Sequence, residues 1–154
     1  MLSSLHRCMA LPCLVATAIA ALTALWPGAA APASAERILD DSGGRIGTYL
    51  IRYETLRKSG QRVAIDGTCA SACTLLLGVI PHDRICVTPR AVLAFHAAWD
   101  PSLTGAQINK PGTKYLWSHY PDDVRRWIAQ HGGLQTKTIY LGGRELAAMF
   151  PTCR

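Results

Sequence analysis

Residues 63–77 read V-A-I-D-G-T-C-A-S-A-C-T-L-L-L, and this stretch decides the fold of the chain. A buried strand is predicted from Arg62 to Asp66, which has an apolar composition, and a short apolar helix from Ser71 to Leu77. The small residues between them, Gly67 and Ala70 among them, permit a tight change of direction. The stretch therefore predicts a strand-to-helix elbow with Ser71 at its tip.

The segments on both sides of this elbow alternate between strand and helix patterns. Strands are expected at Arg37 to Asp40, Ile85 to Val87, Val92 to Phe95 and Ile139 to Leu141, and helices at Ile46 to Ser59, Asp122 to His131 and Arg144 to Met149. Residues Trp99 to Gly112 are rich in Pro, Gly, Asn and Asp and are expected to form an excursion or lid. This alternation predicts an α/β fold with a mostly parallel sheet.

The N-terminal segment has the composition of an export signal. Met1 to Ala35 carries Arg7 near its start, then an apolar centre, and ends in A-S-A at residues 33–35. This pattern is typical of a secretory signal peptide, although an uncleaved membrane anchor is the alternative. We expect residues 1–35 to be removed, leaving no stable membrane anchor, and residues 36–154 to form a single domain that is periplasmic or secreted.

Charge and motif content argue against several functions. The net charge is +6, but Arg and Lys are scattered and do not form a stripe interleaved with aromatic residues. A solvated basic surface is therefore favoured over a nucleic-acid partner. The sequence has no C-x-x-C pair and no G-x-x-x-x-G-K loop. We therefore expect no metal site and no cofactor.

Four cysteines lie outside the predicted signal peptide: Cys69, Cys73, Cys86 and Cys153. An even number in an exported domain indicates two disulfides, and the sequence allows three connectivities. The preferred pairing is Cys73 with Cys86 and Cys69 with Cys153, because a helix that follows an elbow usually packs on the next strand.

Ser71 and a histidine at the end of a later apolar strand, His96, suggest a nucleophile and its base. The helix that starts at Ser71 would direct backbone N–H groups and a positive dipole end toward a developing oxyanion. Gly43 and Gly44, which follow a neighbouring predicted strand, would add a second donor. The alternative interpretation is that Ser71 caps its own helix and that His96 is a hydrogen-bonded residue at the rim of the core.

The order of these motifs resembles the proteolytic subunit of Clp protease and its wider crotonase-like superfamily, in particular short exported members. The resemblance runs from about Ile38 to His96, and it is carried by S-G-G at residues 42–44, G-T-C-A-S-A at 67–72 and R-I-C-V-T-P-R-A-V-L-A-F-H at 84–96. It implies a repeated β-β-α core, truncated at the N-terminus, that hydrolyses peptide bonds with a serine and forms rings or trimers.

The same resemblance assigns roles to residues. Ser71 matches the nucleophile and His96 the base, while Gly43 and Gly44 with the N–H of Ala72 match the oxyanion hole. The position of the acidic third member falls on Thr138, which cannot stabilise an imidazolium by charge.

Four carboxylates elsewhere in the sequence could replace that acid: Asp100, Asp122, Asp123 and Glu145. A Ser-His dyad is also possible. Two functions stay open at this point. One is an exported serine hydrolase acting on peptide or protein substrates, and the other is a catalytically inactive binding or assembly module in the cell envelope, with a homo-oligomer possible in either case.

Overall fold

A computed structural model describes residues 35–100 and 107–154 of the chain, and the strands in these ranges form one sheet. The strands are β1 (Glu36–Asp41), β2 (Val63–Ala70), β3 (Ile85–Val87), β4 (Val92–Phe95) and β5 (Ile139–Gly142). Strands β1, β3 and β4 each pair with β2 in parallel, and β5 pairs with β4 in antiparallel fashion. The predicted α/β fold with a mostly parallel sheet is confirmed.

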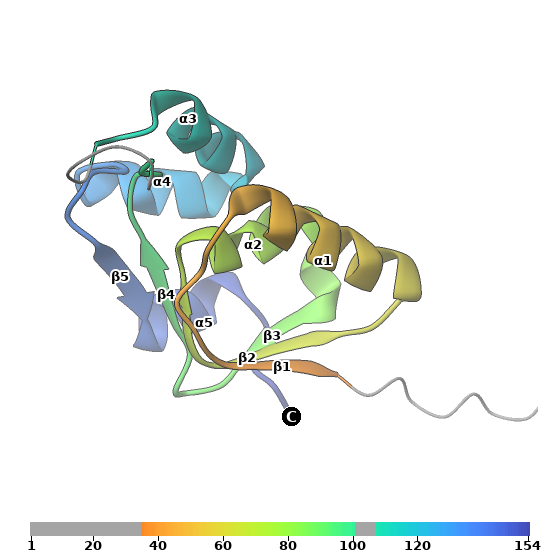
Figure 1. Ribbon diagram of the computed structural model, residues 1–154. Coiled ribbons are helices and arrows are strands. Elements are labelled where there is room, and N and C mark those ends of the chain that lie inside the picture. The colour runs from red at the N-terminus through yellow and green to blue at the C-terminus, as the bar shows by residue number, and fades with distance from the viewer. Residues whose placement is uncertain (1–34, 101–106) are drawn as a thin grey trace, which may run out of the picture. The chain divides into compact units, whose positions relative to one another are not determined.

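Helices connect these strands. They are α1 (Ile46–Ser59), the 3₁₀ helix η1 (Ser71–Leu75), α2 (Leu76–Val79), the 3₁₀ helix η2 (His82–Arg84), α3 (Lys110–His119), α4 (Asp122–Gln130) and α5 (Gly143–Met149). Helices α1 and α2 lie together on one side of β1, β2 and β3, whereas α3 and α4 lie beyond the end at which β4 finishes (Figure 1). The region past the carboxyl ends of β2 and β4 is therefore bordered by helices on two sides.

Helix α1 is fixed to the sheet at its C-terminal end. It buries Tyr53 and Leu56 and stops at a left-handed Gly60. The guanidinium of Arg84 donates hydrogen bonds to the carbonyl oxygens of Leu56 and Arg57 and also to that of Gln61. The last carbonyl groups of a helix have no hydrogen-bond donor within the helix. Arg84 supplies donors to two of them and thereby ties α1 to the start of β3.

Strand β2 continues past Asp66, where the sequence pattern placed its end. A Cβ atom added to Gly67 would lie 1.3 Å from the carbonyl oxygen of Leu39. The register between β1 and β2 shifts between Ile38 and Asp40, beside this point. Gly67 therefore allows two strands to approach closely at an irregularity, and the elbow itself begins later, at Ser71.

The segment after β4 differs from the prediction of a single excursion from Trp99 to Gly112. Helix α3 already begins at Lys110, because the side chain of Asn109 accepts a hydrogen bond from the Gly112 amide at 2.8 Å and Pro111 is tolerated in a first turn. A bridge between Trp99 and Ile108 forms the base of the remaining excursion. Its residues 101–106 lie outside the described part of the chain.

The disulfides join Cys69 to Cys73 and Cys86 to Cys153, so the preferred pairing was wrong although all four cysteines are bonded. Cys69 is the last residue but one of β2 and Cys73 lies in η1, with their Cα atoms 5.4 Å apart. The segment carrying Cys153 runs beside β3, where the Cys153 amide donates to the carbonyl of Val87. The preference failed because it placed η1 beside β3, whereas the terminal segment with Cys153 takes that position and leaves Cys73 to pair with Cys69.

Candidate active site

The predicted nucleophile and base follow neighbouring strands of the sheet. Ala70 of β2 pairs in parallel with Ala94 of β4, and Ser71 and His96 come just after these two residues. Paired strands are about 4.8 Å apart. Because both strands end at the same edge, the two residues lie close together, at the edge where open α/β sheets bind ligands.

A cavity of about 510 Å³ lies at this edge, and we refer to it as the Ser71 cavity. Its described lining comes from the S-G-G turn after β1, the first residues of α1, the elbow, the residues after β4, and α3. It brings together Ser71, His96, Gly43 and Gly44, four of the residues selected from the sequence. Ala72, the fifth, follows Ser71 in η1 and is buried.

Ser71 has a strained backbone. Its φ of 54° lies in the left-handed region, and among the described residues no other non-glycine residue has a positive φ. Such a conformation persists only where the surrounding structure enforces it. Thr74 donates from its hydroxyl to the Ser71 carbonyl at 2.6 Å, and the Cys69–Cys73 disulfide closes the turn around Ser71. The elbow is thus held in the shape that projects a serine side chain.

The Ser71 hydroxyl itself makes no hydrogen bond with the described residues, and η1 has no side-chain cap. The structure therefore gives no support to the alternative that Ser71 is a helix cap.

Gly43 packs directly on the elbow. A Cβ atom at this position would lie 2.5 Å from the Ala70 carbonyl oxygen, 2.7 Å from the Ser71 Cβ and 2.9 Å from the Ala72 nitrogen. With φ at +82°, Gly43 also adopts a conformation that other residues avoid. Its amide donates to Oδ1 of Asp41 at 2.9 Å. The Gly43 N–H is therefore engaged by a carboxylate, in contrast to the oxyanion role predicted for it.

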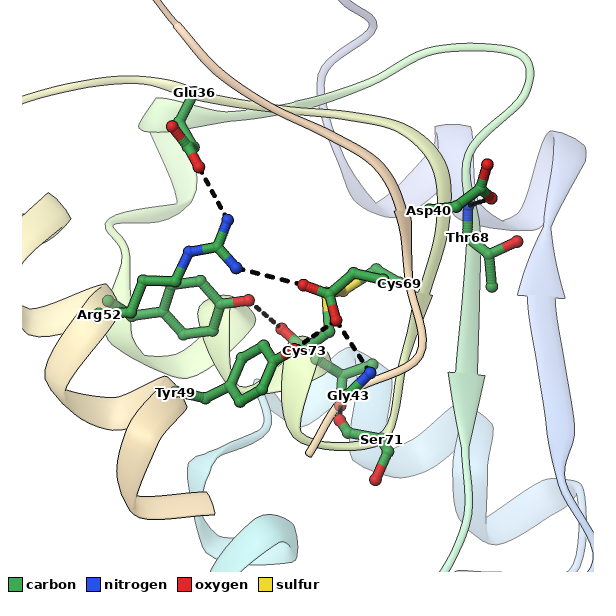
Figure 2. Close-up of a disulfide and its surroundings, with 12 residues drawn as sticks. Glu36, Asp40, Gly43, Tyr49, Arg52, Thr68, Cys69, Ser71 and Cys73 are labelled. Carbon is green, nitrogen blue, oxygen red and sulfur yellow. Dashed lines mark hydrogen bonds and ion pairs between the residues drawn. A yellow bond between two sulfur atoms is a disulfide. The ribbon is translucent and has the colours of Figure 1, made fainter. Parts of the chain in front are cut away.

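Asp41 is the centre of a polar network that holds this turn, and its partners Gly43, Tyr49 and Arg52 are labelled in Figure 2. The Tyr49 hydroxyl and the Arg52 guanidinium both donate to its carboxylate, and Arg52 also pairs with Glu36 at 2.8 Å. Burial, together with the hydrogen bond to Asp41 and its charge, raises the pKa of Tyr49 to about 12. The Tyr49 hydroxyl therefore remains a hydrogen-bond donor to Asp41 at neutral pH and helps to fix the S-G-G turn.

One nitrogen of His96 has a defined partner. The Nδ1 atom lies 2.7 Å from the carbonyl oxygen of Ala97. A carbonyl only accepts, so Nδ1 carries the proton in the neutral ring and Nε2 presents a lone pair. The backbone of the next residue thus selects the tautomer that a general base requires.

The four predicted substitutes for the third acid do not form a group beside His96. Asp122 and Asp123 begin α4, and Glu145 is exposed on α5; none of them lines a cavity that contains His96. Asp100 follows β4 by a few residues, and its amide donates to the carbonyl of Gln107. Within residues 35–99 and 107–154, no carboxylate accepts a hydrogen bond from His96.

A second cavity, of about 480 Å³, contains His96, Thr138, Asp40 and Asp41, and we call it the Thr138 cavity. Thr138 is beside His96 because β5 pairs Ile139 with Phe95. The two aspartates were not selected from the sequence. Their signal was their position at the end of β1, immediately before the S-G-G turn and next to the strand that carries Ser71.

Comparison with known proteins finds similarity to a solved structure but no matching family model. A mutant of ClpP1 from Listeria monocytogenes is similar in structure, with a TM-score of 0.43 and 14% sequence identity over 76% of this chain and 71% of that chain. No family model and no curated protein matches the sequence. Within the described ranges, no helix has the length and apolarity needed to cross a membrane, and no cluster of His, Cys, Asp and Glu has the arrangement of a metal site.

Proposed function

We propose that this chain is an exported serine hydrolase that cleaves peptide or protein substrates, with Ser71 as nucleophile and His96 as general base. The observation that supports it best is the pair of features in one cavity: a serine on a strained elbow and a histidine whose Nδ1–H is engaged by the Ala97 carbonyl. A nucleophile and an oriented base in the same cavity are the minimum that covalent hydrolysis requires.

In the proposed reaction, Ser71 Oγ attacks the substrate carbonyl carbon while His96 Nε2 takes the hydroxyl proton. The tetrahedral intermediate collapses, the carbon–nitrogen bond breaks, and the proton passes from His96 to the leaving amine. Water then attacks the acyl-serine with His96 again as base, which releases the acid and restores Ser71. No hydrogen bond joins Ser71 to His96 among the described residues, and catalytic hydrogen bonds often tighten only when substrate binds.

The oxyanion is assigned to the amides of Gly44 and Ala72. Gly44 lines the Ser71 cavity, and Ala72 is the second residue of η1, where an N–H has no partner within the helix. Gly43 keeps its amide on Asp41 and acts as the close-packing residue that sets the distance between the turn and the elbow.

The two disulfides support export to an oxidising compartment, where such bonds persist. We propose that residues 1–35 serve as the signal peptide. N-terminal sequencing of the exported protein should then begin at Glu36, and a protein that keeps Met1 or its apolar segment would contradict this.

An inactive binding or assembly module is the second candidate. It is favoured by one observation, that the partner of His96 Nδ1 is a neutral carbonyl and not a carboxylate. A neutral partner orients the ring but stabilises the imidazolium less, so a dyad is slower than a full triad.

A fluorophosphonate probe separates the two candidates. We expect stoichiometric labelling of the folded wild-type protein, none of Ser71→Ala, and a rate lower by about 10²- to 10⁴-fold for His96→Ala. Ser118→Ala, which removes an exposed hydroxyl on α3, should label like the wild type. Wild-type protein with intact disulfides that resists the probe would contradict the hydrolase and favour the inactive module.

A further inference from the structure

The Ser71 cavity contains a single permanent charge among its described lining residues. That charge is the guanidinium of Arg45, the residue that precedes α1. No carboxylate belongs to this lining. A cavity with one cation and no anion favours a negatively charged ligand over a neutral or positive one.

Arg45 is exposed and forms no ion pair with the described residues. Arg52, which lies further along α1, is instead paired with Glu36 (Figure 2) and with Asp41. The first turn of α1 contains no acidic residue that could compensate Arg45 from its own helix. The charge at the cavity is therefore available to a substrate.

The position of Arg45 places this charge near the reacting atoms. Gly43 packs on the Ser71 side chain, and Arg45 is two residues further along the chain. Two residues span at most about 7 Å, and an extended substrate advances about 3.3 Å per residue. The Arg45 backbone thus lies within about 7 Å of Gly43, and its long side chain can reach a substrate side chain one or two residues from the bond under attack.

The remaining lining between the two sides of the cavity is largely apolar. Four lining residues are apolar: Ile46, which follows Arg45, Leu116 of α3, and Ala98 and Trp99, which follow β4. Trp99 is 53% exposed, so its ring is free to cover an apolar side chain of a ligand.

We infer that Arg45 is a specificity-determining residue, and that the preferred substrates are acidic peptides with an Asp or Glu side chain within about two residues of the scissile bond. This inference rests on the proposed function. It assigns Arg45 to recognition of the carboxylate and Ile46 and Leu116 to the apolar part of the same substrate.

Two fluorophosphonate probes of equal length test the inference, one with a carboxylate in its linker and one with the matching carboxamide. We expect the wild-type protein to react faster with the carboxylate probe by about tenfold, the effect of one charge-assisted contact. The ratio should fall to about one in Arg45→Gln, stay above one in Arg45→Lys, and be unchanged in Arg144→Gln, an exposed arginine on α5. High salt should reduce the wild-type ratio.

The outcomes distinguish the inference from the proposed function. Equal rates for the two probes in the wild type, or an unchanged ratio in Arg45→Gln, would overturn the role of Arg45 while labelling itself upholds the hydrolase. Absence of labelling by both probes would overturn the hydrolase and the inference together.

Discussion

Ser71 illustrates how a single residue can be costly for stability and useful for chemistry. A non-glycine residue in the left-handed region costs roughly 1 to 2 kcal/mol, and Ser71 adopts it with φ at 54°. The hydroxyl of Thr74, itself hydrogen-bonded to Tyr120 at 2.7 Å, holds the Ser71 carbonyl. Burial raises the pKa of Tyr120 to about 12, so the Tyr120 hydroxyl stays protonated over the physiological range and keeps its hydrogen bond with Thr74.

Replacing Ser71 with glycine should separate the two effects. Ser71→Gly is expected to raise the free energy of unfolding by about 1 kcal/mol, because glycine adopts a positive φ without strain, and to abolish fluorophosphonate labelling. Urea denaturation and labelling of the same preparation measure both. A less stable Ser71→Gly would show that the elbow is not strained.

Gly43 and Gly44 form a matched pair for a second prediction. Gly43→Ala should lower the free energy of unfolding by at least about 2 kcal/mol, since its Cβ would clash with backbone atoms and its φ is positive. Gly44→Ala should change it by less than about 1 kcal/mol, because its nearest contact would be the Tyr49 ring at 3.4 Å. Equal costs for the two variants would contradict the packing described for the turn.

At the scale of elements, most strands and helices were predictable from apolar periodicity. Helix α1 and strands β3 and β4 have the predicted bounds. Helix α3 was missed because Pro111 and Gly112 look like loop residues until the cap from Asn109 is seen. The partners of Asp41 were beyond sequence reasoning, because they depend on which helix residues face the end of β1.

Asp66 connects three elements and makes their assembly sensitive to acid. The side chain is buried in β2 and accepts hydrogen bonds from Arg37 of β1 and from Thr88 and Arg90, which follow β3. These donors, Arg90 foremost, hold the pKa of Asp66 well below its ordinary value of 3.8. The ionised form of Asp66 is therefore more stable in the folded protein than in the unfolded chain.

The sign of the resulting pH dependence follows. Because the folded pKa is the lower one, the stabilisation is complete above the ordinary value of 3.8 and is lost as the pH falls below it. Asp66→Asn should give a flatter curve of unfolding free energy between about pH 6 and about pH 2 than the wild type. Asp83→Asn, at an exposed position in η2, is the control. Parallel curves for the wild type and Asp66→Asn would contradict this account.

At the scale of the whole molecule, the two disulfides have different consequences. The Cys86–Cys153 bond closes a loop with a sequence separation of 67, and the Cys69–Cys73 bond one of 4. Loop-closure entropy gives about 4 kcal/mol for the first and about 2 kcal/mol for the second. The first bond holds the terminal segment against β3, and the second encloses Ser71.

Two double variants test this division. Cys86→Ala/Cys153→Ala should lose more unfolding free energy than Cys69→Ala/Cys73→Ala, by about 2 kcal/mol. The fluorophosphonate labelling rate should fall more in Cys69→Ala/Cys73→Ala, because the elbow loses its closure. Denaturant titrations compare the unfolding free energies of the two variants, and labelling time courses compare their reaction rates. If either comparison gave the opposite ranking, the roles assigned to the two disulfides would be wrong.

The position of the covalent adduct is the most direct measurement of whether this cavity activates a serine. Wild-type protein with both disulfides intact is treated with a fluorophosphonate and analysed by tandem mass spectrometry of its peptides. We predict one adduct per chain, on the Ser71 hydroxyl oxygen, which forms about 10²- to 10⁴-fold more slowly when His96 is replaced by glutamine. An adduct on another residue, or an unmodified Ser71 in the folded protein, would contradict the account.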